Sequence, residues 1–204
     1  MTTVVLATKN AHKVTELEGI LQPQLPGLVL QAFGGEEPVE NGTTFAENAL
    51  IKARNAARET GLPALADDSG IAVDILGGAP GIFSARWAGA KQGDRANYEL
   101  LLEQLKDIAP EHRGAQFVCA AALAIPDASG GIAYETSVLG IWPGHLLQQA
   151  SGDHGFGYDP VFQPEGLTIS SAELTPEQKN ALSHRNRAFH GMVPILREQL
   201  KVSQ

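Results

Sequence analysis

Residues 64–75 constrain the fold most, because an apolar run is interrupted there by two adjacent carboxylates and then resumes. Leu65-Ala66 is typical of the end of a buried strand, and residues 71–75 alternate as a half-buried strand does. The residues that separate them, Asp67-Asp-Ser-Gly70, favour a turn. We therefore predict two strands joined by a bend that carries two acids.

Asp67 and Asp68 are predicted to differ in role, since consecutive side chains of a strand point to opposite faces of the sheet. Acids at the rim of a sheet are suited to holding a divalent ion. An ordinary turn with two solvated acids explains the same residues. The stretch by itself leaves both interpretations open.

The composition narrows the class of protein. With 204 residues, of which 43% are hydrophobic and 19% charged, the chain can bury a substantial core as one large domain or two modest ones. Its formal net charge of -8 disfavours binding to a nucleic acid polymer, which depends on basic side chains. A local cationic pocket for a small anion is still compatible with that charge.

Cys119 is the single cysteine, so an intrachain disulfide is impossible and a reducing compartment is expected. It lies in an apolar run and is interpreted as a core residue rather than a nucleophile. No apolar stretch is long enough to span a bilayer, and the N-terminal residues lead into a strand-like run without a cleavage signal. These features predict a soluble, cytoplasmic protein with no membrane partner.

A first candidate ligand site follows the strand predicted over residues 4–7. Thr8-Lys-Asn10 comes next, and an amphipathic helix is predicted over residues 11–21. Backbone N–H groups at the start of a helix bind phosphate, and Lys9 and Lys13 add positive charge. The alternative is that a polar residue caps the helix and both lysines are solvated.

A second set of polar groups surrounds a helix predicted over residues 44–60. An acidic loop, residues 36–40, precedes this helix, and its Glu40 either binds a metal ion or is solvated. The sequence Thr44-Phe-Ala-Glu47 has the pattern of a capping box. Lys52 lies on the same helix and points either at a ligand or at water.

Beyond the acidic stretch, the pattern predicts a helix over residues 94–105 and a pair of strands over residues 117–125 and 132–142, the second ending at Pro143-Gly144. The loop 152–160 is rich in glycine and carries two aromatic residues. An exposed aromatic ring can stack on a base, and glycines let the backbone approach a ligand. The alternative is that these rings cover the core.

A final helix is predicted over residues 175–201, begun by Thr175 as its cap with Gln178 three residues on, and kinked at Pro194. Lys179, His184 and Arg185 lie close together in its first part. They form a candidate clamp for an anion, and a surface helix of no special role is the alternative.

Taken together, these segments resemble the ITPase-like (HAM1-type or RdgB-type) family of purine nucleoside triphosphate pyrophosphatases. The matching motifs occur in the family's order and cover nearly the whole chain. Each motif is weak alone, and the six together are specific. They are Thr8-Lys-Asn-Ala-His-Lys13, Thr44-Phe-Ala-Glu-Asn-Ala49 with Lys52-Ala-Arg54, Ala66-Asp-Asp-Ser-Gly70, Gly77-Gly-Ala-Pro-Gly81 with Ser84-Ala-Arg86, Gly155-Phe-Gly-Tyr-Asp-Pro160 and Ser183-His-Arg185.

The resemblance implies an α/β fold with an elongated mixed β-sheet flanked by helices. It implies a single domain over residues 1–204, with two lobes around a central cleft, and a homodimer as the assembly. The implied reaction is Mg²⁺-dependent hydrolysis of ITP, dITP and XTP to the monophosphate and pyrophosphate. This reaction would remove deaminated purines from the nucleotide pool.

The resemblance also implies roles for individual residues. Glu40 and Asp68 would hold Mg²⁺, and Asp68 would be the catalytic base toward the attacking water. Phe156 would be the face on which the base stacks. The residues that would contact the nucleotide are Thr8, Lys9, Asn10, Lys13, Lys52, Ser69, Phe156, Gly157, Tyr158, Asp159, Lys179, His184 and Arg185.

Two other functions are compatible with the same motifs. A Maf-like pyrophosphatase would share the architecture and the reaction type but act on other nucleotides. A non-catalytic nucleotide-binding module would keep the cleft without the reaction, although the presence of both Glu40 and Asp68 argues against it.

Overall fold

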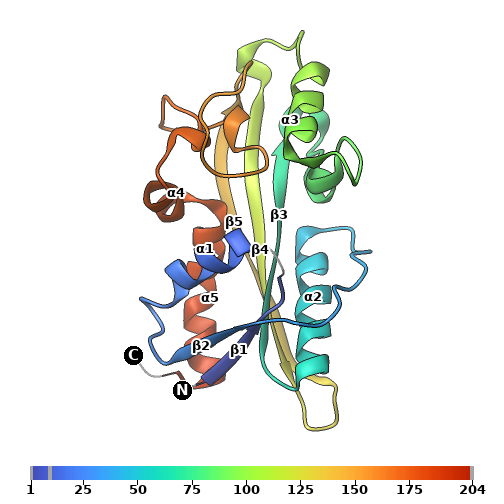
Figure 1. The fold of residues 1–204 in the computed structure, drawn as a ribbon, viewed down its shortest axis with the longest axis vertical. Coiled ribbons are helices and arrows are strands. Elements are labelled where there is room, and N and C mark those ends of the chain that lie inside the picture. The colour runs from blue at the N-terminus through green and yellow to red at the C-terminus, as the bar shows by residue number, and fades with distance from the viewer. Residues whose placement is uncertain (1, 9–10, 203–204) are drawn as a thin grey trace. The chain divides into compact units, whose positions relative to one another are not determined.

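The computed structural model describes residues 2–8 and 11–202, with only the backbone of residues 11 and 12, and shows a mixed α/β fold (Figure 1). Within this part of the chain, the strands form one sheet in the order β2-β1-β3-β4-β5-β6. The strands are β1 (Thr2–Leu6), β2 (Leu28–Ala32), β3 (Ala64–Val73), β4 (Gly114–Pro126), β5 (Ile132–Leu146) and β6 (Phe162–Pro164). The helices are α1 (Ala11–Leu21), α2 (Phe45–Thr60), α3 (Gly93–Gln104), α4 (Pro176–Leu182) and α5 (His184–Leu200).

The sheet combines both strand directions, which confirms the predicted α/β class with a mixed sheet. β1 is parallel to β2 and to β3, whereas β5 and β6 are antiparallel. The chain divides into two compact units. The first unit is Met1–Asp68, Cys119–Gly140 and Arg185–Gln204, and the second is Ser69–Val118 and Ile141–His184.

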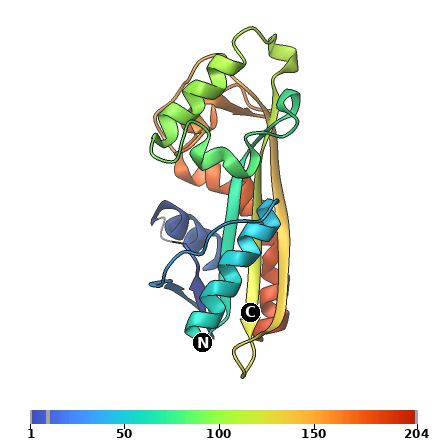
Figure 2. The same cartoon turned by 90° about the vertical axis from the view of Figure 1, so that its right-hand side faces the viewer.

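The first unit has helices on both faces of its strands. α1 and α5 pack on one face and α2 on the other (Figure 1), and Figure 2 shows α2 in front of the strands. The face toward α2 is lined largely by alanine, which lets the helix backbone lie close to the sheet. The fully buried alanines of this contact are Ala49, Ala53, Ala56, Ala57, Ala64, Ala120, Ala122 and Ala124.

The second unit has its own apolar core, which contains most of its large side chains. It includes a group of aromatic rings: the Phe117 ring centroid lies 4.6 Å from that of Phe162 and 6.4 Å from that of Trp142. Leu101 of α3 and Val161 are fully buried in the same cluster. Each unit therefore has a core of its own.

The predicted bend after Asp67 and Asp68 is wrong, because β3 runs without interruption from Ala64 to Val73. Just beyond the predicted bend, Ile71 donates its N–H to Ser84 Oγ over 2.9 Å and Ala72 pairs with Pro80, so the strand keeps partners there. The strand then ends earlier than expected. Ile75 lies in a short 3-10 helix and is 47% exposed rather than half-buried in a strand.

Two further boundaries differ from the prediction. β5 continues through Pro143-Gly144 to Leu146, because Gly144 to Leu146 pair with β6. The predicted final helix is two helices, since Ser183 has an extended backbone (φ -64, ψ 158) between α4 and α5. The residues on both sides of Ser183 have helical periodicity, so the sequence pattern does not reveal the one extended residue between them.

The helix starts follow the sequence closely. Thr175 and Gln178 form the predicted capping box of α4. At α2, Thr44 caps the helix as predicted, its Oγ1 accepting from the Glu47 N–H over 3.1 Å. The reciprocal bond is shifted by one residue, because the Glu47 side chain accepts from the Thr43 N–H rather than from Thr44.

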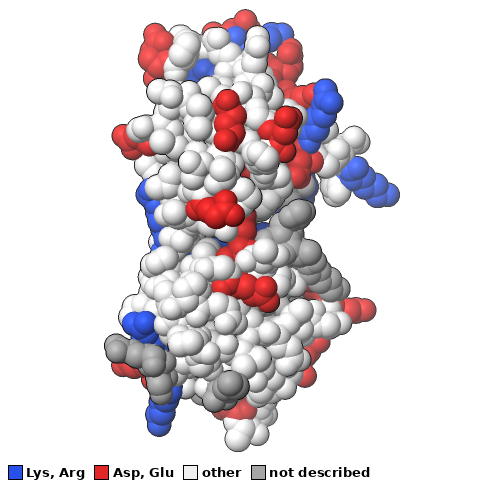
Figure 3. Space-filling model, turned by 60° about the vertical axis from the view of Figure 1, so that its left-hand side comes forward, with Lys and Arg blue, Asp and Glu red and all other residues white. Residues whose placement is uncertain are grey.

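Figure 3 shows where charged side chains lie on one face of the molecule. On the face drawn in Figure 3, Asp and Glu side chains are scattered among mostly uncharged residues. Among the described residues, no helix combines the length and apolarity needed to cross a membrane.

Gly70 is expected to tolerate no side chain, because a Cβ there would lie 2.4 Å from Ser84 Oγ and 2.6 Å from the Gly81 carbonyl oxygen. Gly70→Ala should lower the free energy of unfolding by about 2 kcal/mol through overpacking. Gly19→Ala is the matched control: a Cβ in this exposed part of α1 meets nothing within 4 Å and should stabilise the helix by roughly 0.5 kcal/mol. Urea unfolding of both variants checks this, and equal stabilities would contradict it.

Candidate functional site

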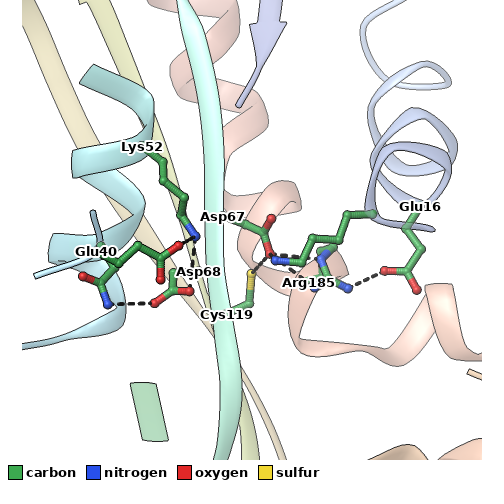
Figure 4. A network of polar contacts seen from close by, with 9 residues as sticks. Glu16, Glu40, Lys52, Asp67, Asp68, Cys119 and Arg185 are labelled. Carbon is green, nitrogen blue, oxygen red and sulfur yellow. Dashed lines mark hydrogen bonds and ion pairs between the residues drawn. The ribbon is translucent and has the colours of Figure 1, made fainter. Parts of the chain in front are cut away.

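The side chains of Asp67 and Asp68 leave β3 on opposite sides, as predicted (Figure 4). Asp67 points toward Arg185, and Asp68 points toward Lys52 and Glu40. Both carboxylates are buried, with residue exposures of 2% and 9%. The two acids therefore belong to separate charge clusters within the first unit.

The Asp67 cluster joins three segments that are distant in sequence. Asp67 Oδ2 accepts from Lys13 Nζ over 3.0 Å and from Nε and Nη2 of Arg185 over 3.3 and 3.2 Å. Arg185 Nη1 also donates to Glu16. Burial would raise the pKa of Asp67, but the charges of Lys13, Arg185 and Lys52 together outweigh burial and hold this pKa well below its usual range. Asp67 is thus an ionised partner for two cations.

The Asp68 cluster brings two carboxylates to one ammonium group. Lys52 Nζ lies 2.9 Å from Glu40 Oε1 and 3.3 Å from Asp68 Oδ1. Asn48 Nδ2 donates to the other oxygen, Asp68 Oδ2, over 3.3 Å. Burial raises the pKa of Asp68, and the charge of Glu40 adds to this rise against the opposing charge of Lys52. For Lys52, burial favours the neutral amine, but Asp68, Asp67 and Glu40 outweigh it and raise the pKa.

This second cluster has the chemistry of a divalent-cation site. Glu40 and Asp68 already direct oxygen atoms at a single positive charge. Mg²⁺ prefers oxygen ligands and is commonly held by one or two carboxylates together with phosphates and water. Within the described residues, no three or more His, Cys, Asp or Glu side chains gather to form a larger metal centre. The residues present fit Mg²⁺ bound jointly with a phosphate ligand.

The second unit carries an aromatic ring with a lysine over it. Lys179 Nζ lies 4.7 Å from the centroid of the Phe156 ring, within the range of a cation–π contact. Asp159, 1% exposed, fixes both residues: its Oδ2 accepts from Lys179 Nζ over 2.6 Å and from the Phe156 N–H over 2.8 Å. Its Oδ1 accepts from Ser171 Oγ over 2.9 Å. Asp159 is therefore an internal support of this loop.

Gly157, Tyr158 and His184, which were also predicted to contact the nucleotide, make contacts within the second unit. Tyr158 is 4% exposed and donates its hydroxyl to the Ser84 carbonyl over 2.8 Å, and burial raises the pKa of its phenol. The Gly157 N–H donates to Asp94 Oδ2 over 2.7 Å. His184 is 5% exposed, and its ring stacks on Phe117 at 4.8 Å between centroids.

The predicted site residues therefore fall into several groups. Lys13, Lys52, Asp68, Glu40 and Arg185 meet in the two clusters of the first unit. Thr8 follows β1, and Ser69 lies on β3. Lys9 and Asn10 lie outside the described residues. The nucleotide contacts and the metal ligation assigned to these residues stay predictions.

Sequence reasoning missed three residues that complete these clusters. Glu16 binds Arg185, Asn48 binds Asp68, and Ser171 binds Asp159. The sequence does point to Asn48, since it lies four residues before Lys52 and so shares its helix face. Nothing in the sequence points to Glu16 and Ser171, because their partners lie 169 and 12 residues away, beyond the reach of local periodicity.

The fold and the site define an α/β protein with a buried carboxylate–lysine centre on a strand of its mixed sheet. The chain belongs to the Ham1 family, whose model matches residues 4–195. It is 55% identical to the dITP/XTP pyrophosphatase of Streptomyces avermitilis, over 98% of this chain and 100% of that protein. The corresponding Streptomyces coelicolor protein is 54% identical over the same shares.

Solved structures of relatives have the same fold. The HAM1 protein from Coxiella burnetii matches with a TM-score of 0.86 at 38% identity, over 97% of this chain and 100% of that one. The nucleoside-triphosphatase, or dITP/XTP pyrophosphatase, from Mycobacterium abscessus matches with a TM-score of 0.75 at 45% identity, over 95% and 100% of the two chains.

Proposed function

We propose that the protein is a Mg²⁺-dependent pyrophosphatase that hydrolyses dITP, ITP and XTP to the monophosphate and pyrophosphate, and so clears deaminated purines from the nucleotide pool. The observation that carries the proposal is the buried Asp68 carboxylate, held with Glu40 around Lys52. Membership of the Ham1 family and the relatives named dITP/XTP pyrophosphatase support the choice of substrate.

In the proposed reaction, Asp68 accepts the proton of the attacking water at a carboxylate oxygen. Its raised pKa suits a general base, since proton transfer is most efficient when the pKa of the base approaches the working pH. Lys13 and Lys52 offset negative charge of the phosphates. Glu40 and Asp68 would hold Mg²⁺, which when bound supplies positive charge for the leaving pyrophosphate.

Base recognition is proposed to use the Phe156 ring and Lys179. Asp159 holds the lysine ammonium over one face of the ring, and the ring offers a stacking surface for a purine. Hypoxanthine and xanthine carry a 6-oxo group where adenine carries an amine. A site that donates hydrogen bonds to this oxygen rejects adenine, because its donors would be left unpaired.

Removal of the metal is the direct test of the reaction. Pyrophosphate release from ITP should proceed with Mg²⁺ and fall by about 100-fold or more when EDTA replaces it. A rate comparison of dITP, XTP, dTTP and dATP is the control for substrate class. Turnover of dTTP equal to that of dITP would favour a Maf-like enzyme, and absence of release from any of them would favour a non-catalytic module.

The homodimer is part of the proposal and is tested separately. Light scattering of the purified chain should give twice the monomer mass. A monomer mass at micromolar concentration would contradict the dimer without bearing on the reaction.

A further inference from the structure

Asn48 is a fully buried polar residue of α2 whose amide is hydrogen-bonded at both ends. Its Oδ1 accepts from the Gly42 N–H over 2.9 Å, and its Nδ2 donates to Asp68 Oδ2 over 3.3 Å. One side chain therefore connects two elements that carry the Asp68 cluster. Gly42 lies in the irregular loop that contains Glu40, and Asp68 lies on β3.

Asn48 and Lys52 together fix the plane of the Asp68 carboxylate. They lie one turn apart on α2, and each binds a different oxygen: Asn48 binds Oδ2 and Lys52 binds Oδ1. Lys52 also binds Glu40, so the loop is tied to the helix at two points, through Glu40 and through Gly42. This arrangement leaves the carboxylate little freedom to rotate.

The contact with the loop depends on the absence of a side chain at Gly42. A Cβ at this position would lie 2.7 Å from Asn48 Oδ1 and 2.7 Å from Glu47 Cβ, closer than real Cβ contacts. The bridge also needs an amide, because one end must accept and the other must donate. Aspartate offers only acceptors, and alanine offers neither.

We propose that Asn48 is a positioning residue for the reaction, and that its amide sets the orientation of the Asp68 carboxylate relative to the loop that carries Glu40. The inference rests on the proposed function, because orientation of Asp68 affects turnover only if Asp68 takes part in it. Asn48 itself binds neither water nor nucleotide in this role. Its loss therefore acts on kcat and leaves nucleotide affinity largely intact.

The test compares Asn48→Ala and Asn48→Asp with the control Asn55→Asp. Asn55 lies on the same helix and binds the loop at the Glu36 carbonyl and the side chain of Glu59, without contacting Asp68. Loss of a hydrogen bond to a charged group changes an equilibrium or rate constant by about tenfold to hundredfold. We therefore expect kcat for ITP to fall at least about tenfold in both Asn48 variants. KM, and the Kd for ITP measured in EDTA, should change less than about threefold, and Asn55→Asp should match the wild type.

Gly42→Ala is a second route to the same result, since it displaces the amide without removing it. It should lower kcat with KM unchanged, even if an Asn48 variant fails to fold. Unchanged kcat in the variants that fold would overturn the proposal. A parallel loss of kcat, ITP affinity and urea stability would also overturn it, because Asn48 would then be merely structural. If the wild type itself releases no pyrophosphate, the proposed function is wrong. If the wild type and the Asn48 variants are equally active, only the role of Asn48 is wrong.

Discussion

Asp68→Asn is expected to remove nearly all turnover while the folded state remains at least as stable as the wild type. The variant loses the group that accepts the proton of water, and loss of a general base lowers kcat by about 1000-fold. The expected stability of the variant has a different cause, the burial of the carboxylate. Because burial raises the pKa of Asp68, its ionised form is disfavoured in the folded state.

The direction of this pKa shift determines how the contribution of Asp68 to stability depends on pH. A carboxyl whose folded pKa is raised contributes its full stability below the unfolded pKa and loses it as pH rises through the folded pKa. At neutral pH the wild type thus carries the cost of a buried charge that asparagine lacks. Pyrophosphate release and urea unfolding at neutral pH check the two halves of the prediction. A near-normal kcat would show that Asp68 is not the general base. A large loss of stability would contradict the conclusion that the ionised Asp68 carboxylate destabilises the folded state.

Asp67→Asn, the same substitution one residue earlier, is expected to lower the free energy of unfolding by about 3 kcal/mol, because breaking a buried ion pair leaves its partner charges uncompensated. Arg185 would keep Glu16 but lose Asp67, and Lys13 would lose its ion pair with Asp67. Activity measured on the folded fraction should fall far less than in Asp68→Asn, since Asp67 faces away from the Asp68 cluster.

The pH dependence of this loss has a defined sign. A carboxyl whose folded pKa is lowered contributes stability above its ordinary pKa, 3.8 for Asp67, and loses it as pH falls through the lowered value. The difference in unfolding free energy between wild type and Asp67→Asn should therefore be full at neutral pH and shrink below pH 3.8. A difference that stays constant down to acid pH would show that the ion pairs are not its origin.

Much of the fold could be predicted, because it depends on local patterns. The predicted helix over residues 11–21 coincides with α1, and the Thr44 and Thr175 caps form where the sequence places them. The bend at residues 67–70 was predicted from turn-forming residue types and is wrong. The strand continues beside β4, and Ile71 and Ala72, just beyond these residues, find partners in Ser84 and Pro80 that the local sequence does not contain.

The sequence by itself determined which residue types are available and that Asp67 and Asp68 point to opposite sides of one strand, since strand geometry alternates side chains whatever surrounds them. Only the tertiary structure decided which cations each acid meets. Lys13 and Arg185 lie 54 and 118 residues from Asp67, and no local periodicity specifies contacts over such separations. Burial raises both pKa values, but the neighbouring cations outweigh it only at Asp67, so the difference in chemistry between two adjacent aspartates is a property of the fold.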